Sequence, residues 1–253
     1  MKRLATTILI IGTFAFITNE LAAQVRVGGK VGANYFIGGQ KIQPDPKDPP
    51  TNPKGLGLAF GAYVEIPFSD LVGIRPELEF SFRKLLTEQS VIQKFDNTQV
   101  TYNGQPATFT GEQTILTETD QRLSYFQINA PITLTPTEGL RVMIGPSFGF
   151  LMSGKRNEDV TTTTKGTLNG NTSLDQNDFE TSKKKGSAAT KDFKKMEMAA
   201  MAGVGYTLDV GLDLDLRYYR GLSTTFDQSQ GSSRYRIWSN LVEFAVGWTF
   251  GGG

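Results

Sequence analysis

The chain contains neither cysteine nor histidine. Without cysteine it has no disulfide framework, thiolate metal site or thiol nucleophile. Without histidine it lacks the most common general base and the most common metal ligand, so most hydrolase sites cannot be assembled from it. The 26 Lys and Arg residues nearly balance the 25 Asp and Glu residues, which argues against nucleic-acid binding through a basic face. We therefore expect no enzyme, no cofactor or bound metal, and no nucleic-acid partner.

One apolar run stands out, and it lies at the N-terminus. Residues 1–23 have the pattern of a secretory signal peptide: Lys2 and Arg3 precede an apolar stretch, and small residues at Ala22 and Ala23 offer a cleavage site before Gln24. The stretch is shorter than the roughly 20 apolar residues that a membrane-spanning helix needs. We predict that it is cleaved on export and that residues 24–253 form a single domain; an uncleaved anchor is the alternative.

After Gln24 the chain alternates between apolar and other residues, as strands with two different faces do. Eight such segments lie near residues 25–37, 56–66, 72–82, 126–134, 140–152, 196–208, 210–218 and 238–250. One face of these segments carries no charged residue, although 20% of the chain is charged. The fold class predicted from this pattern is all-β.

The connections between these segments alternate in length. Long loops are expected near residues 38–55, 84–121, 154–193 and 220–235, and short turns lie between them. Long loops on one side, short turns on the other and an even number of strands are typical of an outer-membrane barrel. We predict an eight-stranded antiparallel transmembrane β-barrel with up-and-down meander topology, four extracellular loops and both termini in the periplasm.

The alternative is a soluble barrel that turns its apolar face inward around a ligand. Side-chain volume favours the membrane, because eight strands enclose too little space for so many large apolar side chains. Trp238 and Trp248 also lie ten residues apart on the apolar face, which corresponds to roughly 25 Å between two aromatic girdles. Pro76, Pro131 and Pro146 fall within strands, where we expect bulges or kinks.

The opposite face is rich in glycine and carries balanced charges, which we predict to form a structural charge network in the lumen. Its members are Arg26, Lys30, Glu65, Arg75, Glu77, Glu79, Arg83, Arg141, Glu197, Asp213, Asp215, Arg217 and Glu243. These side chains would fill the bore as a plug; the alternative is a conducting pore or proton pathway. Glu77 with Glu79 and Asp213 with Asp215 are acid/base candidates for an enzyme, but their arginine neighbours favour structural pairing.

Two of the expected loops carry further candidate sites. Lysines gather in and after the third one, at Lys183, Lys184, Lys185, Lys191, Lys194 and Lys195, where they are candidates for contact with the phosphates of lipopolysaccharide. The alternative is a solvated tether. Residues 44–53 of the first loop form a proline-rich run that either binds a partner or only stiffens the loop.

Several motifs resemble the PorT family of outer-membrane β-barrels of Gram-negative bacteria. They are Gly28-Gly29-Lys30-Val31-Gly32-Ala33-Asn34, Gly73-Ile74-Arg75-Pro76-Glu77-Leu78-Glu79-Phe80-Ser81, Tyr125-Phe126-Gln127-Ile128-Asn129-Ala130-Pro131, Gly145-Pro146, and Leu214-Asp215-Leu216-Arg217-Tyr218 with Gly221-Leu222. The resemblance implies the barrel fold and a location in the outer membrane.

Our functional hypothesis is a small closed barrel with a structural or interaction role in the cell envelope. The alternative is a secretion-accessory or ligand-binding barrel that acts through its long third loop. The expected partners are outer-membrane lipid, lipopolysaccharide, the barrel-assembly machinery during insertion, and an envelope protein.

Overall fold

The computed structural model describes residues 25–250, which are almost entirely antiparallel β-sheet. Its strands are β1 (Arg26–Gln43), β2 (Lys54–Pro67), β3 (Val72–Ile74), β4 (Glu77–Tyr102), β5 (Gln105–Asn129), β6 (Ile132–Thr137), β7 (Leu140–Leu168), β8 (Thr172–Lys185), β9 (Met196–Thr207), β10 (Leu212–Gln230) and β11 (Ser233–Phe250). One short helix, α3 (Ser187–Thr190), follows β8. Within residues 25–250 no helix is long and apolar enough to cross a membrane. The predicted signal peptide, residues 1–23, lies outside the described residues.

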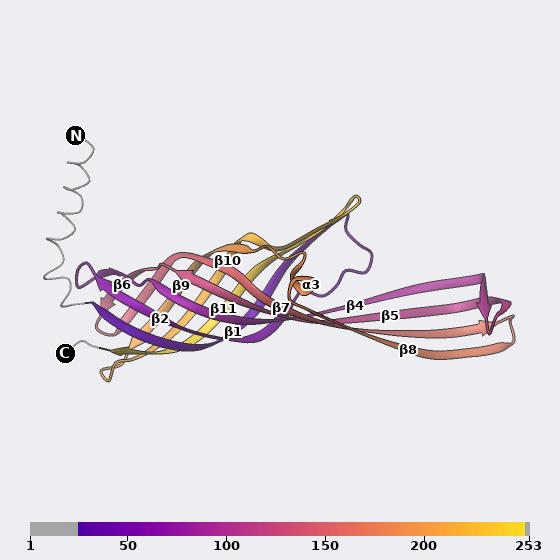
Figure 1. The fold of residues 1–253 in the computed structure, drawn as a ribbon, viewed down its shortest axis with the longest axis horizontal. Coiled ribbons are helices and arrows are strands. Elements are labelled where there is room, and N and C mark those ends of the chain that lie inside the picture. The colour runs from indigo at the N-terminus through magenta and orange to yellow at the C-terminus, as the bar shows by residue number, and fades with distance from the viewer. Residues whose placement is uncertain (1–24, 251–253) are drawn as a thin grey trace.

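The strands wind around a common axis, and both ends of the described chain lie at the same end of the molecule (Figure 1). Along the sheet the order is β1-β11-β10-β9-β7-β5-β4-β2, and β1 also pairs with β2. Strand β3 continues the line of β4, and β6 continues the line of β5. All pairings are antiparallel. Apart from β1 and β11, the paired strands are near neighbours in sequence.

The two faces of the strands differ in exposure as the alternation predicts. Along β2, Leu56 and Leu58 are 69% and 64% exposed, whereas Ala59 and Tyr63 are 4% and 1% exposed. The exposed residues point away from the axis, and the buried ones point into the lumen. The apolar face is therefore the outer face, because side chains repeat with a period of two along a strand.

Strands break at Pro76 and Pro131, whereas Pro146 lies within β7, and the register does not shift at any of the three. The predicted bulges are therefore wrong, and the kinks stay a prediction. Asn129 pairs with Ser147 before Pro131, and Ile132 pairs with Ile144 after it. A step of three residues in one strand therefore still matches a step of three residues in its antiparallel partner. The carbonyl of each proline still accepts a neighbouring N–H: Val64 donates to Pro76 at 3.0 Å, Arg75 to Pro131 at 2.9 Å and Ala130 to Pro146 at 3.1 Å. Only the reciprocal bond of each pair is lost, because proline has no N–H.

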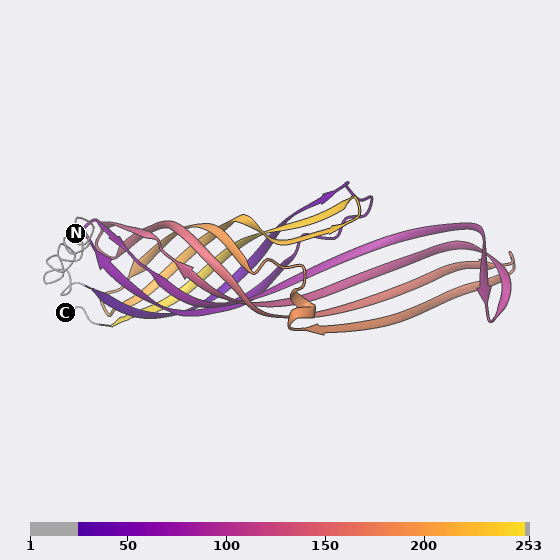
Figure 2. The ribbon, with the colours of Figure 1, turned by 45° about the horizontal axis from the view of Figure 1, so that its top comes forward.

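The second and third expected loops, residues 84–121 and 154–193, are mostly strand. Strands β4, β5, β7 and β8 continue past the rest of the sheet as a four-stranded antiparallel projection, which we call the blade (Figure 2). The 16 residues of β4 from Thr87 to Tyr102 correspond to roughly 50 Å at the usual rise per residue. The expected loops at 38–55 and 220–235 are also partly strand, and β1, β10 and β11 form a shorter second projection.

The hairpin of β4 and β5 ends in a two-residue Asn-Gly turn, and the hairpin of β7 and β8 ends in a three-residue connection that begins with Asn-Gly. Asn103 and Gly104 have φ angles of 49° and 77°, and Asn169 and Gly170 have φ angles of 50° and 72°. Two consecutive positive φ angles define the type I′ turn, whose twist matches that of a hairpin. The blade forms because its backbone groups pair between neighbouring strands and its β-branched Thr residues favour extended structure.

Candidate functional site

The lumen holds the predicted charged residues. Twelve of the thirteen are buried; Arg26 is the exception, with a side chain that is 44% exposed at the mouth beside the termini. Each of the thirteen has at least one partner of opposite charge within 4.0 Å. The structure therefore brings these residues together, from strands far apart in sequence.

Lys30 of β1 lies among three carboxylates. Its Nζ atom is 2.9 Å from Glu77, 2.5 Å from Glu79 and 3.2 Å from Glu243. Arg217 of β10 donates to both oxygens of Glu77, at 2.5 and 2.8 Å, and to Asp215 at 2.7 Å. These contacts tie β1, β4, β10 and β11 together across the lumen, and paired, hydrogen-bonded charges are the form in which charge can be buried.

Two further arginines extend the network toward the termini. Arg75 lies 3.2 to 3.5 Å from four carboxylates, those of Glu65, Glu77, Asp213 and Asp215. Arg141 donates to Glu65 at 3.1 Å and to Asp215 at 2.8 Å. The acid/base candidates Glu77 and Asp215 are thus each held by more than one cation.

Two buried tyrosines that sequence reasoning missed support this network. Arg75 stacks on the ring of Tyr63, 3.5 Å from its centroid, and Arg83 lies 4.3 Å from the centroid of Tyr125. Tyr63 also donates to Asp213, and Arg83 donates to Glu197. Both tyrosines occupy inward positions of the alternation, so the period of two could have placed them beside the charges.

The lumen half farther from the termini contains a buried apolar cluster, which the sequence analysis did not anticipate. Its buried cluster consists of Phe36, Leu85, Leu123, Tyr125, Met201, Tyr219, Phe226, Ile237 and Leu241. Phe36 is 0% exposed and Leu241 is 1% exposed. In helix α3, Ala189 is 5% exposed, and its carbonyl accepts a hydrogen bond from the Gln121 side chain at 2.8 Å. We call this cluster the apolar plug.

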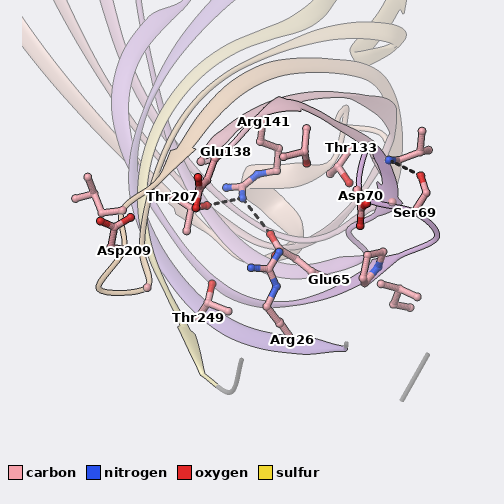
Figure 3. A pocket seen from close by; sticks show the side chains of 18 of the residues that line it. Arg26, Glu65, Ser69, Asp70, Thr133, Glu138, Arg141, Thr207, Asp209 and Thr249 are labelled. Carbon is pink, nitrogen blue, oxygen red and sulfur yellow. Dashed lines mark hydrogen bonds and ion pairs between the residues drawn. The ribbon is translucent and has the colours of Figure 1, made fainter. Parts of the chain in front are cut away.

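A cavity of 550 Å³ opens at the mouth beside the termini (Figure 3). Arg26, Glu65, Arg141 and Thr207 line it, and Arg141 bridges Glu65 and Thr207. A smaller cavity of 180 Å³ lies at the opposite mouth, above the apolar plug. Burial there raises the pKa of Tyr235 to about 12. Within residues 25–250 no group of three or more acidic side chains is placed to hold a metal ion.

The six predicted lysines do not form one surface. Lys183 and Lys185 lie on one face of β8, and Lys184 lies on the other, because successive residues of a strand point to opposite sides. The remaining three follow α3, and Lys194 approaches Asp227 of β10 at 4.0 Å. All six are exposed.

The antiparallel sheet, the apolar outer face and the charged lumen together define a membrane-embedded β protein. In a comparison with protein families, residues 19–227 match the outer membrane protein beta-barrel domain. The chain belongs to this family, and it is an outer-membrane β-barrel protein.

Solved structures of other outer-membrane proteins resemble the chain weakly. Ail, the attachment invasion locus protein of Yersinia pestis, is 12% identical, with 88% of this chain and 98% of Ail covered and a TM-score of 0.32. Neisserial surface protein A is also 12% identical, with 88% and 97% covered and a TM-score of 0.31. OprG from Pseudomonas aeruginosa is 11% identical, with 90% and 97% covered and a TM-score of 0.36. No curated protein sequence matches the chain.

Proposed function

We propose that the protein is a small closed barrel of eight strands with a structural or interaction role in the cell envelope. To reach eight strands, we count β3 and β4 as one strand and β5 and β6 as another. The pairing register is the same on both sides of the proline that separates each pair. Strand β8 belongs to the blade and is left out. The pairing of β1 with both β2 and β11 supports closure.

The main support for a closed lumen is the burial of the side chains that fill it. Arg75 and Glu79 are 0% exposed, and so is Phe36 in the apolar plug. A continuous aqueous bore would leave lumen side chains accessible to water, as in larger porins. Charges and apolar side chains therefore occlude successive levels of the barrel.

Planar-bilayer recording tests this proposal. Purified protein should give no stable open channel, while a general porin reconstituted in the same bilayers gives its usual conductance. Steady conductance from this protein would overturn the closed lumen.

We also infer that the protein is not an enzyme. Its buried carboxylates are held by cations and serve as structural partners. Glu77→Gln should lower the stability of the barrel. In assays with ester, peptide and glycoside substrates, the variant should show no selective loss of hydrolysis relative to the wild type. Selective loss of one such activity, with folding intact, would support the enzyme instead.

A second candidate is a secretion-accessory or ligand-binding barrel that contacts a partner through its third loop. One observation favours it: β8 pairs with β7 on one side, and no other described strand covers its second edge. An uncovered edge offers backbone groups to an added strand. Crosslinking in intact cells, with and without the outer part of β7 and β8, tests this role; contacts that are lost with the segment support it, and unchanged contacts contradict it.

The proposal also includes export of the protein and its orientation in the outer membrane. We infer that residues 1–23 are cleaved as a signal peptide in a Gram-negative cell and that the blade lies on the extracellular side. Family resemblance to PorT supports the secretion-accessory alternative, because the member that gives the family its name takes part in protein secretion. Protein sequencing of the mature N-terminus should find Gln24 or a residue within one or two positions of it.

A further inference from the structure

Four cations from four neighbouring strands form one transverse row at the base of the blade. Lys84 pairs with Arg122, Arg122 with Lys155, and Lys155 with Lys185. Directly paired residues share a face of the sheet, with neighbouring strands about 4.8 Å apart, so the row is roughly 15 Å long. We call these four residues the cation row.

The cation row lies on the outer face of the barrel. Lys84 is two residues from Phe82, an outward residue that is 43% exposed, and therefore points to the same side. Arg122 has a side chain that is 61% exposed, and Lys155 and Lys185 are exposed as well. These charges thus continue the face that carries the apolar band.

Like charges placed directly opposite one another destabilise a sheet unless they have counter-ions. The row has one carboxylate nearby: Asp120 lies 3.5 Å from Lys84 and 3.0 Å from Arg122. Lys155 and Lys185 have no ion-pair partner among residues 25–250. The row therefore keeps a net positive charge that a bound anion would neutralise.

Aromatic residues place this row relative to the membrane. Phe60, Phe80 and Phe126 lie side by side on the outer face, with ring centroids 5.5 and 5.4 Å apart. Lys84 follows Phe80 by four residues, which is about 13 Å along the strand and roughly 10 Å along the membrane normal at a tilt of about 40°. In the proposed orientation these rings belong to the outer half of the apolar band, which brings the cations to the headgroup layer.

We propose that the cation row binds the phosphate groups of lipid A, the lipid anchor of lipopolysaccharide, in the outer leaflet. This inference rests on the proposed orientation, with the blade outside the cell. Lysine and arginine beside one another on adjacent strands match two phosphates spaced along a headgroup, and each cation at a membrane surface contributes to such binding. Of the six lysines singled out from the sequence, only Lys185 belongs to the row.

Retention of lipid by the full-length mature protein in mild detergent tests the proposal. The probes are lipid A with two phosphates and the same lipid without phosphate, with bound lipid measured by native mass spectrometry. A variant combines Lys84→Gln, Arg122→Gln, Lys155→Gln and Lys185→Gln. The matched control combines Lys47→Gln, Lys94→Gln, Lys165→Gln and Lys184→Gln, which removes the same charge from exposed positions outside the row.

We expect the wild type and the control to retain the phosphorylated lipid at least about tenfold better than the row variant does. Equal retention of both lipids by the wild type would overturn the proposal, and so would equal loss in the row variant and the control. Displacement of the lipid by an equal concentration of pyrophosphate would indicate a site for soluble anions and would also overturn it. Heat-modifiable gel migration verifies folding, and bilayer conductance of the same samples tests the closed lumen separately.

Discussion

At the residue scale, stability depends on charges that are buried only because they are paired. Arg217 is 1% exposed and donates to Glu77 and Asp215. Replacement by methionine would leave these carboxylates short of a partner in a low-dielectric lumen. We expect Arg217→Met to destabilise the barrel by about 3–5 kcal/mol.

Urea unfolding in detergent micelles, followed by tryptophan fluorescence, measures this loss. The matched control is Arg26→Met, because Arg26 also pairs with a lumen carboxylate but has a side chain that is 44% exposed. Its loss should cost less than about 1 kcal/mol. Equal costs for the two variants would contradict a buried, mutually dependent network.

Glycine on the inner face provides a second prediction. A Cβ atom at Gly57 would lie 1.9 Å from the backbone oxygen of Phe82, so the strands could not remain in place. We expect Gly57→Ala to cost about 1–3 kcal/mol, measured by the same unfolding assay. Gly29, on the outer face, has its nearest such contact at 3.9 Å, and Gly29→Ala should stay within about 0.5 kcal/mol of the wild type.

The sequence predicted which face is uncharged and, apart from Arg26, which residues carry the buried charges, because a period of two assigns each residue to a face. It could not predict which charges meet. Lys30 reaches Glu243 across 213 positions in the chain, and that contact exists only because β1 pairs with β11. The apolar plug was missed because the sequence analysis identified lumen residues by their charge. The residues of the plug occupy inward positions but are uncharged.

At the element scale, the main difference from expectation is the blade. Its strands carry polar residues on both faces, so they lack the alternation that identifies a strand in a membrane. Two Asn-Gly pairs, at residues 103–104 and 169–170, were the available signal, since this dipeptide between extended segments indicates a tight hairpin. The sequence analysis did not use these dipeptides and therefore expected loops.

The blade should be dispensable for folding of the barrel. Residues 90–116 and 158–182 can each be replaced by Asn-Gly, which joins the paired residues Gln89 with Thr117 and Asn157 with Lys183. The lumen network and the apolar plug lie outside the removed segments. We expect heat-modifiable migration and an unfolding midpoint close to those of the full chain.

Removal of residues 196–218 is the comparison, because β9 and part of β10 lie within the barrel and carry Glu197 and Arg217. That variant should fail to fold. Failure of the shortened blade as well would show that the projection stabilises the barrel and is not an independent appendage.

At the scale of the whole molecule, the outer face determines where the protein resides. Exposed large apolar residues surround the sheet, from Val31 and Leu56 on the first strands to Phe244 and Trp248 on the last. An exposed apolar surface of this extent needs a covering medium. Family membership and the inward placement of the charges both indicate that the medium is lipid.

An arginine at Phe244 tests this directly. Phe244 is 51% exposed and pairs with Ala33 and Leu216, well inside the apolar band. Phe244→Arg should destabilise the inserted barrel by about 2–4 kcal/mol, measured as reversible unfolding from lipid vesicles. Phe179→Arg is the matched control: Phe179 is 78% exposed on β8 of the blade, away from the band, and its replacement should change stability by less than about 0.5 kcal/mol. If both variants inserted and unfolded like the wild type, lipid would not be what covers the outer face.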